Sequence, residues 1–316
     1  MQYEPASMVA QRAAFGQGLL ELAEREPRLL VLDADVCCST QTHLFREKYP
    51  DRFCQVGIAE QNLVGIAAGL SAVGLIPFVS AFAVFLTERA GDQIRNAVAH
   101  PRANVKLNGA YCGLPTGRGG ATHSAVEDIA VMRCLPNLTI FDPADANETI
   151  RCMELAMQID GPVYLRTVRC EVPTIFPASH TVPPGKAVAL RTGSDVTIVS
   201  SGMMTAKAQA ACELLEAQHI HAEHLHMPCI KPLDREALRA SAAKTGRVVT
   251  VENHSVIGGL GSAVCEALCG DLPVPVRRLG FPDVFAQCGD DETLFTRYGM
   301  NTAQIAEAAL ELLHRP

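Results

Sequence analysis

The sequence lacks the basic character of a protein that binds polyanions. Its formal net charge is −7, its isoelectric point is near 5.8, and no run of lysine and arginine is dense enough to offset that balance. Because binding to nucleic acid or to an anionic membrane surface depends on clustered positive charge, we expect neither partner.

Paired cysteines are also missing. The twelve cysteines are scattered, none forms a Cys-x-x-Cys pair, and the stretch from Met1 to Gln11 does not resemble a secretory leader. This spacing gives no sign of a disulfide framework. We therefore expect reduced, mostly buried thiols in a cytoplasmic protein.

No long hydrophobic run is free of helix breakers. The uncharged stretch 63–86 has the length of a membrane-spanning helix, but it is interrupted at Gly65, Gly69, Gly74 and Pro77. We expect instead a helix rich in alanine and glycine, a turn at Gly74 and a buried strand over 76–80.

What the sequence does contain is an alternation of helical periodicity with short, wholly apolar strands. Such strands, separated by helices, predict a parallel sheet covered on both faces. With 316 residues, 48% of them apolar, the chain is long enough for two α/β domains. In the first half we expect strands over 29–32, 76–80, 105–108, 138–141 and 163–165, and helices over 7–24, 60–73, 88–99, 126–134 and 145–160.

A segment rich in proline and glycine, 173–193, reads as a linker to a second α/β unit. The second unit is expected to have strands over 196–200, 221–227, 247–252 and 276–279, and helices over 205–218, 234–244, 259–268 and 302–314. Four histidines lie near one of these strands, but alternation places His224 and His226 on one face and His221 on the other, so we predict no metal site there.

One carboxylate stands at the start of an expected helix. Residues 54–62, Cys-Gln-Val-Gly-Ile-Ala-Glu-Gln-Asn, place Glu60 behind a β-branched run and a turn glycine. Glu60 could simply complement the helix dipole. It could also be an acid that activates a cofactor, since burial among Val56, Ile58 and Leu63 would favour its protonated form. The glutamate alone leaves both interpretations open.

Two further segments change the balance. Phe82 and Phe85 are three positions apart, a spacing that suits core packing but also an aromatic surface for a flat ring. The loop 117–124, Gly-Arg-Gly-Gly-Ala-Thr-His-Ser, allows close approach of backbone to a ligand and presents His123 for proton transfer.

Together these three segments resemble the transketolase family, in the family's order and at its spacing. The resemblance runs from about Ala6 to the C-terminus. It implies a pyrimidine-binding domain with a parallel, doubly wound sheet over 1–172, a linker over 173–193 and a C-terminal α/β domain over 194–316. It implies thiamine diphosphate as cofactor, with Glu60 on N1′ of the aminopyrimidine, Phe82, Phe85 and Ile58 around that ring, and His123 on the donor sugar.

A family motif that is absent is equally informative. The chain nowhere contains the Gly-Asp-Gly segment, followed by Asn, with which this family holds Mg²⁺ and the diphosphate of the cofactor. Without these oxygen ligands we expect no metal ligands in this chain. The resemblance therefore implies a second chain, an N-terminal diphosphate-binding subunit, and a split enzyme of α2β2 composition, with cofactor at each interface between unlike chains.

Substrate positions are partly kept and partly changed. Arg12, Ser39 and Arg169 match the family's ligands for the sugar phosphate, and arginine forks suit phosphate oxygens. Where the family has a histidine this chain has Tyr111. Arg118 and Gly119 replace two acidic residues of the family's loop, so we expect an altered acceptor specificity.

The predicted activity is transfer of a two-carbon ketol unit between sugar phosphates or related acceptors, by a subunit that needs a partner. Two enzymatic alternatives stay open: the β subunit of a 2-oxo acid dehydrogenase or decarboxylase, and an enzyme like deoxyxylulose-phosphate synthase. The third alternative is a catalytically silent scaffold subunit, although an intact Glu60 with its aromatic pair favours catalysis.

Overall fold

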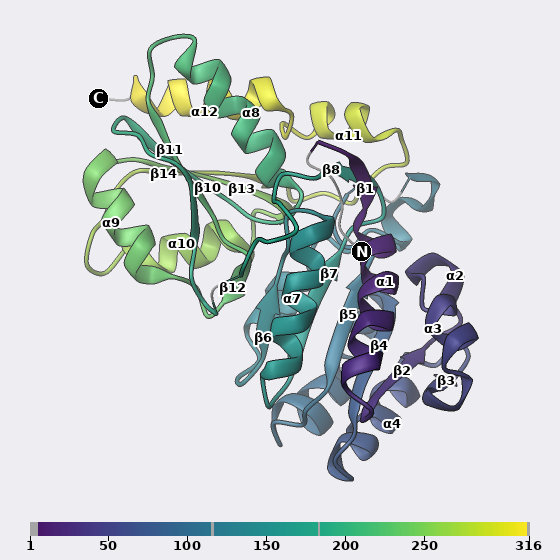
Figure 1. Cartoon of the computed structure of the whole chain (residues 1–316). Helices are drawn as coiled ribbons and strands as arrows, with labels where there is room; N and C mark the ends of the chain where they lie inside the picture. Colours follow the sequence, from purple (N-terminus) through teal and green to yellow (C-terminus); the bar gives the residue numbers. More distant parts are fainter. Residues whose placement is uncertain (1–5, 115–116, 183, 315–316) are drawn as a thin grey trace.

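A seven-stranded sheet dominates the first half of the chain (Figure 1). The computed structural model describes residues 6–114, 117–182 and 184–314, with the backbone alone at 117 and 118. The strand order is β12-β6-β7-β5-β4-β2-β3, and all neighbours are parallel except β12 and β6. The strands are β2 (Leu29–Asp33), β3 (Phe53–Gln55), β4 (Ile76–Phe82), β5 (Lys106–Ala110), β6 (Thr139–Phe141), β7 (Val163–Thr167) and β12 (Cys229–Lys231).

Helices cover both faces of this sheet. Phe15 and Leu19 of α1 and Met153 of α7 pack with Phe78 on one face, whereas Leu63 of α4 and other side chains cover the opposite face. This confirms the doubly wound parallel sheet expected from the apolar strands. The helices are α1 (Gln11–Arg25), α2 (Cys37–Thr40), α3 (His43–Lys48), α4 (Glu60–Ala72), α5 (Gly91–Gln93), α6 (Asp128–Arg133) and α7 (Ala146–Gln158).

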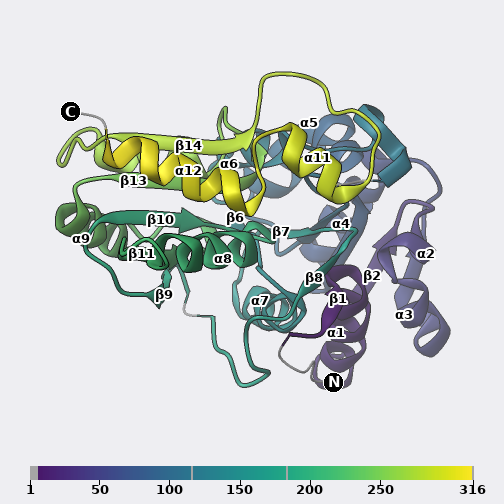
Figure 2. The same ribbon diagram turned by 90° about the horizontal axis from the view of Figure 1, so that it is seen from above.

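A five-stranded sheet of order β14-β13-β10-β11-β9 forms the second unit, parallel except for β9. Helices α8 and α12 lie side by side on one face (Figure 2), and α9 and α10 pack on the other. The strands are β9 (Val188–Arg191), β10 (Val196–Ser200), β11 (Ala222–His226), β13 (Val248–Ser255) and β14 (Val276–Phe281). The helices are α8 (Met204–Glu216), α9 (Arg235–Thr245), α10 (Leu260–Leu268), α11 (Asp291–Arg297) and α12 (Thr302–Leu313).

The structure departs from the expected elements in several places that border the site, among them α2 and β3, which were not expected. The first helix begins at Gln11 instead of residue 7, because β1 (Met8–Ala10) pairs antiparallel with β8 (Glu171–Pro173). The segment 88–99 is helical as expected, but it is not one continuous α-helix. The chain there forms two π-helical segments, Phe85–Arg89 and Ile94–Ala99, on either side of α5.

Most of the cysteine thiols are at least partly exposed, whereas His224 and His226 of β11 are buried. The thiols are not mostly buried: only Cys112, Cys152, Cys212 and Cys229 are, because others, such as Cys134 and Cys269, cap exposed helix ends. All twelve are free.

Both His224 and His226 are buried and hydrogen-bonded, the first to Ser200 and the second to Thr205 and Glu148. Among the described residues, no helix combines the length and apolar character needed to cross a bilayer.

A buried polar network joins the two sheets. The guanidinium of Arg166 on β7 donates to both carboxylate oxygens of Asp128, at 2.8 and 3.0 Å, and to the backbone oxygen of Asn253 on β13 at 2.9 Å. Asp142 forms a second ion pair with Arg166 at 3.0 Å. All these side chains are buried. Because buried charges are tolerated only when they are paired, the network holds the two sheets in one arrangement.

Replacing Asp128 by alanine is expected to lower the free energy of unfolding by about 3–5 kcal/mol, because a buried cation loses its bidentate partner. The hydroxyl of Tyr164, which donates to Asp128 at 2.8 Å, loses its acceptor as well. Urea unfolding of the chain measures the change. The control is Glu24→Ala, which removes an exposed ion pair with Lys48 and should leave the midpoint unchanged. Equal midpoints for the two variants would contradict the role assigned to the network.

Candidate active site

The predicted site residues gather at one edge of the first sheet. Strands β7, β5, β4, β2 and β3 are neighbours in that order, and all five run parallel. Arg169 follows β7, Tyr111 follows β5, Phe82 ends β4, Ser39 follows β2 and Glu60 follows β3. The carboxyl edge of a parallel sheet is where such folds bind ligands, so five separate segments converge where chemistry is expected.

Glu60 is the first residue of α4 and its side chain is 2% exposed. Leu63, three residues further along α4, is fully buried, but Ile58 is 74% exposed, so the expectation that Ile58 buries Glu60 is wrong. The physical reason is the turn at Gly57, which has a φ of 73°, an angle that glycine adopts most readily. The residue after this turn, Ile58, faces outward.

The carboxyl of Glu60 has a partner that sequence reasoning missed. Nη1 of Arg89 donates to Oε2 of Glu60 at 2.7 Å, and the same guanidinium lies 4.7 Å from the centre of the Phe85 ring. Arg89 ends the π-helical segment that Phe85 begins. The available signal was its spacing of four residues from Phe85, which on an α-helix places the two side chains on one face. That spacing indicates a contact with Phe85 and not one with Glu60.

The aromatic residues form one cluster. The ring centres of Phe82 and Phe85 are 5.9 Å apart, and those of Phe82 and Tyr111 are 4.4 Å apart. His123 meets both phenylalanines edge to face, at 6.0 and 5.4 Å. Its Nδ1 lies 2.8 Å from the hydroxyl of Thr122, which fixes the ring and leaves Nε2 for a further hydrogen bond. The loop and the aromatic segment, distant in sequence, thus share one surface.

Tyr111 links this cluster to the predicted phosphate ligands. Nη1 of Arg12 donates to the hydroxyl of Tyr111 at 3.1 Å and to the backbone oxygen of Ser39 at 3.3 Å. The guanidinium carbons of Arg12 and Arg169 lie 5.9 and 5.8 Å from the centre of the Tyr111 ring. Two cations therefore lie near one aromatic ring, an arrangement suited to an anionic group.

Local structure holds this region in an uncommon conformation. Tyr111 has a φ of 60°, which is strained for an aromatic residue and persists only where surrounding contacts enforce it. The Ser39 segment is organised by Asp33, whose buried carboxylate accepts from the Val36 backbone and from the hydroxyls of Thr40 and Thr42. The side chain of Arg118 lies outside the described residues, and Gly119 is half-buried.

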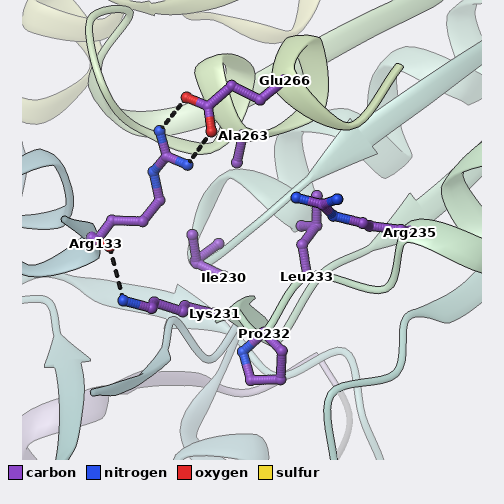
Figure 3. Close-up of a pocket in the computed structure, with 8 residues that line it drawn as sticks. All are labelled: Arg133, Ile230, Lys231, Pro232, Leu233, Arg235, Ala263 and Glu266. Atoms are coloured by element: carbon purple, nitrogen blue, oxygen red, sulfur yellow. Dashed lines mark hydrogen bonds and ion pairs between the residues drawn. The ribbon is translucent and has the colours of Figure 1, made fainter. Parts of the chain in front are cut away.

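A separate cavity lies at the junction with the second unit (Figure 3). It measures about 370 Å³ and includes none of the predicted site residues. Arg133 is paired with Glu266 at 2.7 and 2.6 Å, and the ammonium of Lys231 donates to the backbone oxygens of Arg133 and Leu135. Because two of the three cations that line the cavity, Arg133 and Lys231 but not Arg235, are already engaged, we assign no ligand to it.

Comparison with known proteins adds to this geometry. Residues 7–174 match the family model of the transketolase pyrimidine-binding domain, and residues 185–305 match that of the transketolase C-terminal domain. The chain belongs to the transketolase family. The resemblance predicted from the Glu60, Phe82–Phe85 and His123 segments is confirmed, together with the fold of two α/β domains.

Several individual relatives align with this chain over nearly the full length of both proteins. One is the 6-deoxy-6-sulfo-D-fructose transketolase subunit SqwH of Clostridium sp. (strain MSTE9), 41% identical over 94% of this chain and 92% of that protein. Another is an apulose-4-phosphate transketolase subunit of Phocaeicola vulgatus, 38% identical over 98% of this chain and 99% of that protein. A solved structure described as a split gene transketolase, inactive β4 tetramer, has 47% identity and a TM-score of 0.91, covering 96% and 98% of the two chains.

The site fits the aminopyrimidine half of the cofactor used by this family. A flat heteroaromatic ring needs an apolar aromatic surface and an acid within hydrogen-bonding reach of a ring nitrogen, and the structure offers Phe82, Phe85 and Glu60 for these purposes. Within 6–114, 117–182 and 184–314, no group of three or more acidic, histidine or cysteine side chains is placed to hold a metal ion.

Proposed function

We propose that this chain is the C-terminal subunit of a split, thiamine diphosphate-dependent transketolase. The observation that carries the proposal is the buried carboxyl of Glu60 beside the Phe82–Phe85 pair, at the carboxyl edge of the sheet. The two relatives above are named as subunits of transketolases. The two matches span more than 90% of both proteins compared, so we favour this function over the two enzymatic alternatives and the silent scaffold.

In the proposed reaction the chain's residues have separate tasks. When bound, thiamine diphosphate supplies the nucleophilic carbon that accepts a two-carbon unit from a ketose. Glu60 would hold a proton at N1′ of the aminopyrimidine, and the phenylalanines would cover the ring. Nε2 of His123 would exchange a proton with a hydroxyl of the sugar, since Nδ1 is engaged by Thr122. Arg12, Ser39, Tyr111 and Arg169 would bind the distal anionic group.

A second chain is part of the proposal. Next to Glu60 the surface carries an exposed Ile58, and α4 turns Gly65 and Gly69 outward, where an added Cβ would meet nothing within 4 Å. An exposed isoleucine beside an acid, with a helix face that another backbone can approach closely, is suited to contact with another chain. We assign that place to an N-terminal subunit that holds Mg²⁺ and the diphosphate, in an α2β2 assembly. Twelve free thiols suit a reducing compartment, so we propose the cytoplasm.

Reconstitution tests this proposal. The chain and a candidate N-terminal subunit, one that carries Gly-Asp-Gly followed by Asn, are purified separately and combined with thiamine diphosphate and Mg²⁺. We expect ketol transfer between sugar phosphates only when both chains are present. Transfer by this chain alone, or none by any combination that forms a stable complex with the cofactor, would contradict the proposal.

The substrate-facing residues predict an altered acceptor specificity. The assembled enzyme should be slow with xylulose 5-phosphate as donor and ribose 5-phosphate as acceptor, because Gly119 has no side-chain carboxylate to accept a hydrogen bond from a sugar hydroxyl and Tyr111 occupies a histidine position. The double change Tyr111→His and Gly119→Asp should raise kcat/KM for this pair about 10-fold or more. Rates typical of ordinary transketolases in the unchanged protein would refute the prediction.

A further inference from the structure

Arg89 occupies both of the groups that the proposed cofactor ring requires. Its Nη1 donates to Glu60 Oε2 at 2.7 Å, and its guanidinium lies 4.7 Å from the centre of the Phe85 ring. The side chain of Glu60 is 2% exposed and that of Arg89 is 46% exposed. Arg89 therefore extends from the surface, across an aromatic ring, to a buried acid.

The guanidinium of Arg89 and an aminopyrimidine ring present similar nitrogen-bearing edges to a carboxyl group. A guanidinium is a planar group that carries several nitrogens in a fixed fork and stacks on aromatic faces. An aminopyrimidine is also planar, with a ring nitrogen next to an exocyclic amino group. Either can lie on the Phe85 face that Arg89 covers and bond to Oε2 of Glu60, and that face and that oxygen cannot serve both groups at once.

We infer that Arg89 is an internal substitute for the aminopyrimidine ring. In the chain by itself it neutralises the buried Glu60 carboxylate and covers Phe85, and it must leave both before the cofactor binds. The inference rests on the proposed function. It explains how an acid with almost no solvent contact is tolerated without cofactor, since a buried carboxylate without a partner is costly.

The position of Arg89 suits a group that moves. It is the last residue of the π-helical segment, and the next residues are Ala90, with φ −104° and ψ 16°, and Gly91. Single π-helical turns are rare and are found often at functional sites. Since nearly half of its side chain is exposed, Arg89 can turn into solvent or toward another chain with little loss of packing.

Cofactor affinity tests the inference directly. Thiamine diphosphate with Mg²⁺ is titrated by calorimetry into the two-subunit assembly carrying either wild-type chain or Arg89→Ala. If the closed arrangement is populated about 90% of the time, removing it should tighten the apparent Kd about 10-fold. The matched control is Arg95→Ala, which removes the same charge from the neighbouring π-helical segment, where Arg95 bonds to Asn96. Its Kd should equal that of the wild type.

A milder variant guards against a folding defect in Arg89→Ala. Arg89→Gln keeps a planar amide that can still donate to Glu60, and it should tighten the Kd by a smaller factor than alanine does. If both variants bind the cofactor no better than wild type, the inference is wrong, and weaker binding would instead make Arg89 a contact of the assembled enzyme. If the wild-type assembly binds no cofactor, the proposed function fails, and the inference with it.

Discussion

Glu60→Gln in the two-subunit enzyme is expected to lower kcat for ketol transfer by at least about 100-fold, the lower range for loss of a positioned proton-transfer group. Glutamine has nearly the same shape, so packing around α4 should be kept. It has no carboxyl proton to share with a ring nitrogen. The effect should appear in kcat and not only in KM, because the lost interaction serves the chemical step.

The control for this result is Glu88→Gln. Glu88 lies in the same π-helical segment as Arg89 and is exposed, so its loss should leave kcat within about 2-fold of wild type, as expected for a surface position. Circular dichroism and size-exclusion chromatography of each variant exclude gross misfolding. Retention of more than about a tenth of wild-type kcat by Glu60→Gln would remove Glu60 from the mechanism, since that loss is below the range for such groups.

Leucine at both Gly65 and Gly69 is expected to abolish assembly with the N-terminal subunit and with it all activity. Both glycines lie on the exposed face of α4, and a Cβ at either one meets nothing within 4 Å in this chain. The substitution should therefore not harm the chain itself. It should even stabilise α4, because glycine in a helix costs about 1 kcal/mol relative to better helix formers.

The opposite signs of the two effects make the experiment decisive. The melting temperature of the isolated chain should stay the same or rise, while analytical ultracentrifugation with the partner should show no complex. Gly270→Leu is the control: Gly270 is also exposed with open space at its Cβ, but it follows α10 in the second unit. Complex formation by the double variant with wild-type affinity would place the partner on a different face.

Sequence patterns predicted well those features that depend on burial alone. Strand β10 matches its expected range, 196–200, and α4 begins at Glu60 as expected, because a short run rich in β-branched residues and a helix rich in alanine leave few alternatives. The grouping of Glu60 with Phe82, Phe85 and His123 followed from motifs whose order is specific to one family. In a parallel sheet, residues just after strand ends must converge at one edge.

Features that depend on pairing between distant side chains could not be predicted in this way. Arg89 was missed as a partner of Glu60 because its reach depends on a π-helical turn that helical periodicity does not reveal. The Arg166 network joins residues from both sheets, and β12 leaves its own domain to pair with β6. Such contacts are set by tertiary packing, which a local pattern does not encode.

Tyr111 shows the same limit within the site. The sequence marked it only as a departure from the family's histidine, yet the structure places its ring centre 5.9 Å from Arg12 and 5.8 Å from Arg169, and against Phe82. Its left-handed backbone conformation, with a φ of 60°, has no signal in the sequence, since tyrosine seldom adopts it. The residue therefore connects the two ends of the proposed site through contacts that sequence alone does not predict.

The central claim is that this chain encloses only half of a cofactor site, and calorimetric titration of thiamine diphosphate and Mg²⁺ tests it most directly. Titrated into the chain alone, the pair should produce no binding up to millimolar cofactor. Titrated into the chain mixed with its N-terminal partner, it should bind with one site per pair of unlike chains. Tight, magnesium-dependent binding by the chain alone would contradict the account.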